Sequence, residues 1–245
     1  MHDGPSAIRE AAAKNTHRVV AELLEREPAC RRVLDVPCGE GAFVQRLAAR
    51  GYHVQGADVQ DQLKVTGAAF VRADMNASLP FEAGAFDAVV SIDGIEHIER
   101  PFDFVRECRR VIRPGGVLVL STPNISALRS RWRWLLTGFH HGSKTPLDET
   151  GPSPWHHIGL VSLPEIRYVL HSNGFQITAL ATNRVKPVSW LYLPLWPIAW
   201  LATTLVFRRW ERDPAQRRRN RGIRGQLLSP AVAFGEALIV KALRA

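Results

Sequence analysis

Apolar runs alternate with amphipathic stretches along the first half of the chain. Short apolar runs bounded by polar or glycine residues predict strands at residues 32–36, 53–58, 69–73, 85–92 and 117–121. Amphipathic stretches predict helices at residues 6–27, 41–50 and 102–112. This strand–helix alternation predicts an α/β fold, in which a doubly wound parallel sheet is covered by helices on both faces.

The second half of the chain has a different pattern. Helices are predicted at residues 128–136 and 163–172, a strand at 175–182, and a strand or short helix at 237–243. Residues 188–207 form an uncharged run of 20 residues, VSWLYLPLWPIAWLATTLVF. That length is enough to cross a membrane, but its two prolines would interrupt a straight helix.

The composition narrows the class of protein. The chain has 245 residues, of which 46% are hydrophobic and 22% charged, so it can bury a core and is neither disordered, collagen-like nor a disulfide scaffold. Its three scattered cysteines favour a reducing, cytoplasmic compartment. The first residues lack the apolar core of a signal peptide, so export by that route is not expected.

The positive charge is concentrated in one segment. The net charge is +9, yet ten Lys or Arg and only two acids fall between Arg184 and Arg224. All seven tryptophans follow Arg131. A nucleic-acid-binding domain would be expected to spread its basic residues more widely, so nucleic acid is not the expected partner. An anionic membrane surface or an acidic acceptor fits the pattern better.

Polar or glycine residues follow each predicted strand. A glycine-containing turn at residues 37–41 comes after the first strand, Asp58 ends the second, and Asp74 follows the third. Ser91 and Asp93 lie at the end of the fourth. Because parallel strands end at one edge of a sheet, these residues are expected to meet there and to form a ligand site.

Five ordered motifs carry a family resemblance: VLDVPCGEG at 33–41, GADV at 56–59, ADMNASLPF at 73–81, FDAVVSIDGIEHIERP at 86–101 and VIRPGGVLVLSTPN at 111–124. With them the chain resembles the class I S-adenosylmethionine-dependent methyltransferases, and more weakly the bacterial members found with polysaccharide genes. A hydride-transferring enzyme would want a third glycine where Val44 stands. The resemblance implies methyltransferase activity and a Rossmann-like, mostly parallel sheet with an antiparallel last strand.

The resemblance also implies S-adenosyl-L-methionine as cofactor, bound by Asp35, Pro37, Gly39, Gly41, Asp58, Val59, Asp74, Met75 and Ser91. Asp35 and the two glycines would shape the methionine and ribose end, and Asp58 would take the ribose hydroxyls. Asp74 would meet the adenine amino group, with Met75 packed on the ring. Pro37 stands where the family usually has glycine, which makes the turn stiffer.

Histidines are the candidate general bases for an oxygen acceptor. His97 follows the fourth strand, and His157 lies in the loop before the helix at 163–172, where the family commonly builds its acceptor site. His140, His141 and His156 are further candidates. Asp93 and Glu96 could join the histidines around a metal ion, but their spacing is loose, so no metal is predicted.

The chain divides into a methyltransferase domain, at residues 1–183 plus 234–245, and an apolar and basic insert at 184–233. The insert separates two strands expected to pair, so a single membrane crossing would pull them apart. We therefore expect it to lie on the inner face of a membrane, and the acceptor to be a lipid-linked or surface glycan. For the insert, the alternative is a buried lid or a dimer surface. For the function, the alternatives are a quinone-type or other small-molecule O-methyltransferase and an RNA methyltransferase.

Overall fold

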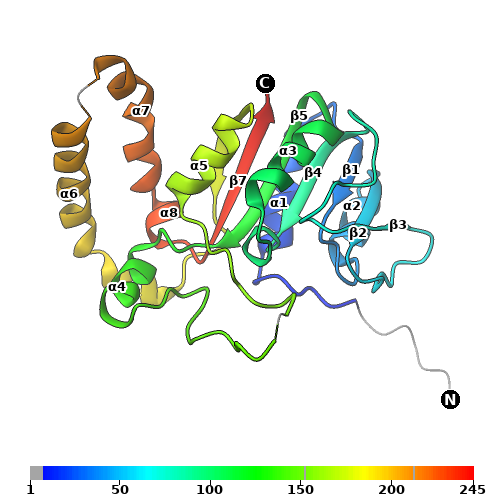
Figure 1. Cartoon of the computed structure of the whole chain (residues 1–245), viewed down its shortest axis with the longest axis horizontal. Helices are drawn as coiled ribbons and strands as arrows, with labels where there is room; N and C mark the ends of the chain where they lie inside the picture. Colours follow the sequence, from blue (N-terminus) through cyan, green and yellow to red (C-terminus); the bar gives the residue numbers. More distant parts are fainter. Residues whose placement is uncertain (1–7, 152, 212) are drawn as a thin grey trace.

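Seven strands form one sheet through the middle of the molecule (Figure 1). The structure is a computed structural model that describes residues 8–151, 153–211 and 213–245. Neighbouring strands follow the order β3-β2-β1-β4-β5-β7-β6. The strands are β1 (Arg32–Asp35), β2 (His53–Asp58), β3 (Ala69–Arg72), β4 (Phe86–Ile92), β5 (Ile112–Pro123), β6 (Phe175–Ala181) and β7 (Ala237–Arg244).

The direction of the strands confirms the predicted α/β sheet. Strands β1 to β5 are parallel to their neighbours among themselves, whereas β7 is antiparallel to both β5 and β6. Consequently β6 runs in the same direction as β5, and both strands end at the same edge of the sheet. Residues 237–243, predicted as a strand or a short helix, belong to β7.

Helices cover both faces of the sheet, and each face has its own apolar core. Val33 packs with α1 and α2, whereas its neighbour Leu34 packs with α3 and α5 on the other face. Successive strand residues point to opposite faces, so a strand covered on both sides reads as a continuous apolar run. The helices in this part are α1 (Thr16–Glu25), α2 (Ala42–Ala48), η1 (Ile95–His97), α3 (Pro101–Val111), α4 (Leu128–Thr137) and α5 (Leu163–Ser172).

Two predicted elements differ from the observed ones by more than two residues at one end. The helix predicted at residues 6–27 is wrong in its first half: α1 begins at Thr16, residues 8–15 are not helical, and residues 6–7 lie outside the described residues. Asn15 has a left-handed backbone, with φ at 71°, which interrupts a continuous helix. Strand β5 is longer than the predicted 117–121, because a bulge between its pairings at Ile112 and Val117 carries the Pro-Gly-Gly turn.

The insert between β6 and β7 is helical. It contains η2 (Pro187–Tyr192), α6 (Leu195–Trp210), α7 (Pro214–Leu227) and α8 (Pro230–Phe234), which form the left side of the molecule in Figure 1. Pro194 is the N-cap of α6 and Pro197 lies in the first turn of this helix, where proline is tolerated. The apolar run is thus divided into η2 before Pro194 and α6 after it. Within the described residues, no helix combines the length and apolar character needed to cross a bilayer.

A separate apolar cluster fastens the insert to α4. Leu128 of α4 is buried with Phe234 of α8, and Trp196 of α6 packs against them. The indole nitrogen of Trp196 donates to the carbonyl oxygen of Leu228 at 3.0 Å. The Asn124 amide, just beyond β5, donates to the carbonyl oxygens of Val232 and Gly235 at 2.9 and 3.1 Å. The insert is therefore anchored at the edge where β5 and β6 end.

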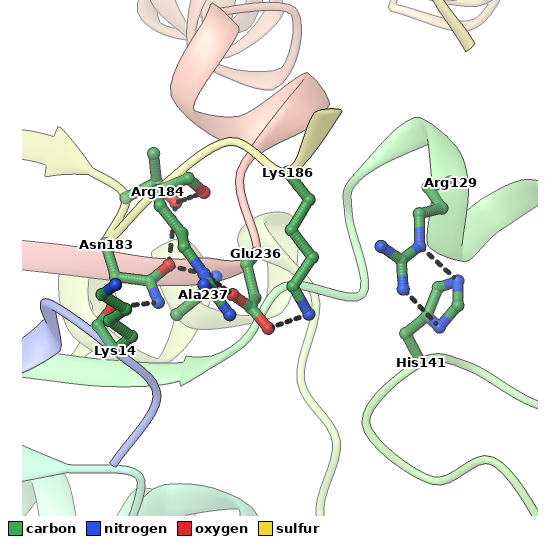
Figure 2. Close-up of polar contacts among 9 residues, drawn as sticks. Lys14, Arg129, His141, Asn183, Arg184, Lys186, Glu236 and Ala237 are labelled. Atoms are coloured by element: carbon green, nitrogen blue, oxygen red, sulfur yellow. Dashed lines mark hydrogen bonds and ion pairs between the residues drawn. The ribbon is translucent and has the colours of Figure 1, made fainter. Parts of the chain in front are cut away.

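Asn183 joins three segments at this edge (Figure 2). Its side-chain amide donates to the Lys14 carbonyl at 3.1 Å, and its side-chain oxygen accepts the buried Ala237 amide at 3.0 Å. We predict that Asn183→Ala lowers the free energy of unfolding by about 1–3 kcal/mol, because the Ala237 amide loses its acceptor. Urea denaturation measures this. Thr150→Ala, in an exposed loop, should change it by less than about 0.5 kcal/mol; equal effects would contradict the prediction.

Candidate functional site

The carboxyl ends of β1, β2 and β4 meet around a cavity of about 990 Å³. This is the edge at which the sequence predicts a ligand site, and a cavity of this size suits a small-molecule ligand. Most of the predicted site residues line it: Asp35, Pro37, Gly39, Asp58, Val59, Asp74, Met75, His97 and His157.

The turn after β1 is tied to the end of β2. The Gly39 amide donates to the Asp58 carboxylate at 2.9 Å, and the Gln60 amide donates to the other oxygen of the same carboxylate at 3.2 Å. Gly39 has φ at 51°, a conformation that favours glycine. Gly41 has φ at 92°, where other residues are strained, and a β-carbon there would meet the Leu63 side chain at 2.4 Å. Asp58 thus shapes the turn as well as facing the cavity.

The loop after β3 forms a second wall. The Asp74 carboxylate accepts the Asn76 amide at 2.8 Å, which leaves its second oxygen without a partner among the described residues. The Asn76 side-chain oxygen in turn accepts the amides of Glu99 and Arg100, at 2.8 and 3.2 Å. Met75 is buried beside them at the cavity wall. A carboxylate with a free oxygen next to an apolar side chain can recognise a planar ring that carries an amino group.

Two predicted site residues do not reach the cavity. Gly41 lies in the turn behind the wall, where it makes room for Leu63. Ser91 is fully buried, and its hydroxyl has no hydrogen-bond partner within the described part of the chain. It lies behind Gly94, which lines the cavity: an added β-carbon at Gly94 would lie 2.7 Å from the Ser91 hydroxyl.

Several lining residues were missed by the sequence interpretation. The segment before α1 lies over the cavity and contributes Arg9, Ala11 and Ala12. Its Arg9 amide donates to the Glu40 carboxylate at 3.1 Å. The sequence of this alanine-rich segment gives no sign that it lines a cavity, because its composition is typical of a helix. Trp155 also lines the cavity, and its place two residues before His157 is a signal that was available.

His97 and His157 present free ring nitrogens. Nδ1 of His97 lies 3.1 Å from the His156 carbonyl oxygen, and Nδ1 of His157 lies 2.7 Å from that of Gly142. A carbonyl oxygen only accepts hydrogen bonds, so each Nδ1 donates, and each Nε2 is left as a proton acceptor in the neutral ring. Burial, and then the neighbouring His157 ring, lower the pKa of His97, which keeps His97 neutral near pH 7. The two rings meet edge to face, with centroids 4.7 Å apart.

Glu96 is a buried acid beside these histidines. Its side chain is 0% exposed, and neither carboxyl oxygen makes a hydrogen bond of ordinary geometry within the described part of the chain. Burial, and then the nearby Asp93, raise the pKa of Glu96 to about 8. Glu96 therefore carries a proton near neutral pH. Asp35 is affected in the same way: burial and then Asp58 raise its pKa well above the ordinary value.

Glu96, His97 and His157 each bring one ligand-type atom within 4.8 Å of the others. Two imidazoles and a carboxylate at this spacing could hold a metal ion such as Zn²⁺, once Glu96 loses its proton. The same arrangement can serve as a proton acceptor without a metal. The expectation that the site has no metal stays a prediction.

Comparisons with known proteins show similarity to methyltransferases. Residues 34–120 match a family described as a methyltransferase domain. The ubiquinone biosynthesis O-methyltransferase of Roseobacter denitrificans is 30% identical over 185 residues, which cover 64% of this chain and 73% of that protein. A Mycolicibacterium smegmatis protein, named as an S-adenosylmethionine-dependent methyltransferase, is 33% identical over 166 residues. That match covers 66% of this chain and 58% of the relative's length.

Solved structures share the fold at low identity. An Archaeoglobus fulgidus SAM-dependent methyltransferase has a TM-score of 0.54 and 18% identity, with 93% of this chain and 94% of that one covered. A [4+2]-cyclase has a TM-score of 0.54 and 20% identity, and the match covers 98% of this chain and 88% of the cyclase chain. The cyclase shares the fold but is named for a different reaction, so the fold alone does not identify the reaction.

The raised pKa of Glu96 has a consequence for stability. Between pH 7 and 8 the folded state holds a proton on Glu96 that the unfolded chain, with an ordinary glutamate pKa, has released. Raising the pH therefore favours unfolding, by about 1 kcal/mol for this group over that interval. We predict that Glu96→Gln removes this loss, as measured by urea denaturation at both pH values. Exposed Glu99→Gln is the control; a Glu96 variant with the pH dependence of wild type would contradict the assignment.

Proposed function

The chain belongs to the class I S-adenosylmethionine-dependent methyltransferases, and on this basis we propose that it methylates an oxygen of a lipid-linked or surface-glycan acceptor at a membrane. S-adenosylmethionine is the cofactor of this family. The acceptor and its location are the proposed part. The observation that carries the proposal is the common edge of the sheet, where the cavity, the two histidines and the insert come together.

The electrostatics of the cavity suit the cofactor. Besides Asp35 and Glu96, whose pKa values are raised by burial, its walls carry four acidic side chains in a chain whose net charge is +9: Glu40, Asp58, Asp74 and Asp93. S-adenosylmethionine bears a positive sulfonium and a positive amino group, so an acid-lined cavity attracts it. Within this cavity Asp58 would bind the ribose hydroxyls, and Asp74 with Met75 would bind the adenine. The turn at 37–41 would hold the methionine end.

The reaction requires alignment more than activation. The acceptor oxygen attacks the methyl carbon, the carbon–sulfur bond breaks, and the electron pair stays on sulfur as S-adenosylhomocysteine leaves. Because the sulfonium is already a good leaving group, the protein mainly supplies proximity and orientation. An acceptor hydroxyl must also lose its proton, and Nε2 of His97 or His157 is free to take it.

An apolar surface supports the membrane location. We use this name for the exposed large apolar side chains of α4, η2, the residue after η2, and α6: Trp132, Trp134, Leu135, Leu136, Val188, Trp190, Leu191, Leu193, Ile198, Trp200, Leu201, Leu205 and Val206. Large exposed apolar areas mark interaction sites, and tryptophan is favoured at the headgroup level of a bilayer. Exposed Arg217 and Arg218 of the neighbouring α7 suit anionic lipid.

A quinone acceptor is the second candidate. The relatives named for ubiquinone biosynthesis favour it, and the same apolar surface would bring the enzyme to a membrane-dissolved quinone. The two candidates differ in the product: a methylated quinone contains no sugar that mild acid releases. An RNA acceptor has less support, because the arginines of α7 lack interleaved aromatic side chains for base stacking.

The role of Asp58 can be tested by cofactor binding. Asp58→Ala should weaken S-adenosylmethionine binding in calorimetry by about ten- to a hundredfold, because it removes a charged hydrogen-bond acceptor and the tether of the Gly39 turn. Asp61→Ala, three residues further along and exposed, is the matched control. Unchanged affinity in the Asp58 variant would show that the ribose is placed elsewhere.

The general-base role of His97 predicts a kinetic defect. His97→Ala should slow methyl transfer to a membrane extract by about 10²- to 10⁴-fold, while S-adenosylmethionine binding stays unchanged. Because the pKa of His97 is lowered, the base is already unprotonated near pH 7, and the wild-type rate should fall in acid. Exposed His53→Ala, on β2, is the control. Loss of the wild-type rate on chelation by EDTA would contradict a metal-free base.

The apolar surface can be tested by flotation. The protein should float with vesicles that contain phosphatidylglycerol. The triple variant Leu191→Ser, Leu201→Ser, Leu205→Ser should lose most of that binding, because it removes apolar area that the bilayer would bury. Tyr168→Ser removes an exposed apolar side chain on α5, outside this surface, and should float like wild type. Wild-type protein that remains at the bottom of the gradient would contradict membrane attachment.

A further inference from the structure

A cluster of cations lies between α4 and the start of the insert. Arg129 and Arg133 come from α4, Lys144 from the loop that follows it, and Lys186 from the residues just before η2. All four lie close enough to the His141 ring to lower its pKa. Figure 2 shows Lys186 and the pair of Arg129 with His141 in one view. We call these four residues the cation cluster.

His141 is neutral at the centre of the cation cluster. Nε of Arg129 donates to Nε2 of His141 at 2.8 Å, so that ring nitrogen carries no proton. Burial first, and then the charges of the four cations, lower the pKa of His141 to about 4. The imidazole thus positions the Arg129 guanidinium without adding charge of its own.

The positive charge of the cation cluster is largely uncompensated. In the described part of the chain, Arg129, Arg133 and Lys144 form no ion pair with a carboxylate. Arg133 donates to the Lys144 carbonyl oxygen at 2.8 Å, and its Nε is buried with no partner among these residues. Lys186 pairs with Glu236, which also pairs with Arg184 (Figure 2). Like charges held this close repel, so the arrangement favours a bound anion.

The cation cluster lies next to the cavity. Gly142 follows His141 directly, and its carbonyl oxygen accepts from His157 at 2.7 Å. A β-carbon at Gly142 would lie 2.9 Å from the side chain of Pro123, which lines the cavity. Helix α4, which supplies the two arginines, also exposes Leu135 and Leu136 of the apolar surface. The segments that carry the cations are therefore linked both to the cavity wall and to the apolar surface.

We propose that the cation cluster binds a phosphoryl group of the acceptor, so that the phosphate of a lipid-linked substrate is held there. The lipid chain would then follow the apolar surface, and the group to be methylated would enter the cavity. Two arginines suit a phosphate because each guanidinium offers several donors in a fixed plane. This assignment rests on the proposed function, and it names the chemical class of the acceptor.

Pyrophosphate is the probe for the test, added to the full chain in calorimetry at constant ionic strength. The double variant Arg129→Gln, Arg133→Gln should bind it about tenfold or more weakly than wild type. Exposed Lys144→Gln, which leaves the packing untouched, should weaken binding by a smaller factor. Arg217→Gln, Arg218→Gln on α7 removes the same charge outside the cluster and should bind like wild type. S-adenosylmethionine binding should be unchanged in all variants, and a cooperative thermal unfolding transition shows that each variant is folded.

The outcomes separate a specific site from general attraction. No pyrophosphate binding by wild type, or equal weakening in both double variants, would overturn the proposal. Binding to phosphatidylglycerol vesicles without binding to pyrophosphate would also overturn it, because the anion would then be a membrane headgroup. Specific pyrophosphate binding by a protein that transfers no methyl group would support the anion site and refute the proposed reaction, so the two failures are distinguishable.

Discussion

The parallel direction of the strands is the constraint on which this molecule depends. Because β1, β2, β4 and β5 all run the same way, the segments that leave them start from one edge of the sheet. Strand β7 runs against both of its neighbours, so β6 ends at that edge as well. The residues that line the cavity, helix α4 and the insert therefore meet at one edge of the sheet, although they come from distant parts of the sequence.

This arrangement sorts three kinds of surface next to one another. Acidic side chains line the cavity, the cations Arg129 and Arg133 stand beside it, and apolar side chains such as Leu191 are exposed further out. A positively charged cofactor, an anionic link and a lipid chain would each meet a matching surface in that order. The helical insert is joined to this edge through Asn124, whose amide bonds the backbone of the residues around α8. A change that loosens that joint would move the apolar surface relative to the cavity.

The sheet and most of the cavity wall were predictable from the sequence. Strands buried on both faces, such as β4, have apolar runs that local pattern detects, and the residues after them must share an edge. Residues 8–15 were mispredicted because their helical composition is overridden by the left-handed Asn15 and by contacts over the cavity. The burial of Glu96, and the burial that first lowers the pKa of His141, arise from tertiary packing, so no local pattern could indicate them.

The most direct test uses S-adenosylmethionine labelled in its methyl group. The protein is incubated with it and a membrane extract, and the products are partitioned between organic and aqueous phases. We predict label in the organic phase, with a labelled sugar released by mild acid. Organic label that mild acid does not release as sugar would indicate a quinone instead. Label confined to the aqueous phase would contradict a lipid-linked acceptor at the membrane.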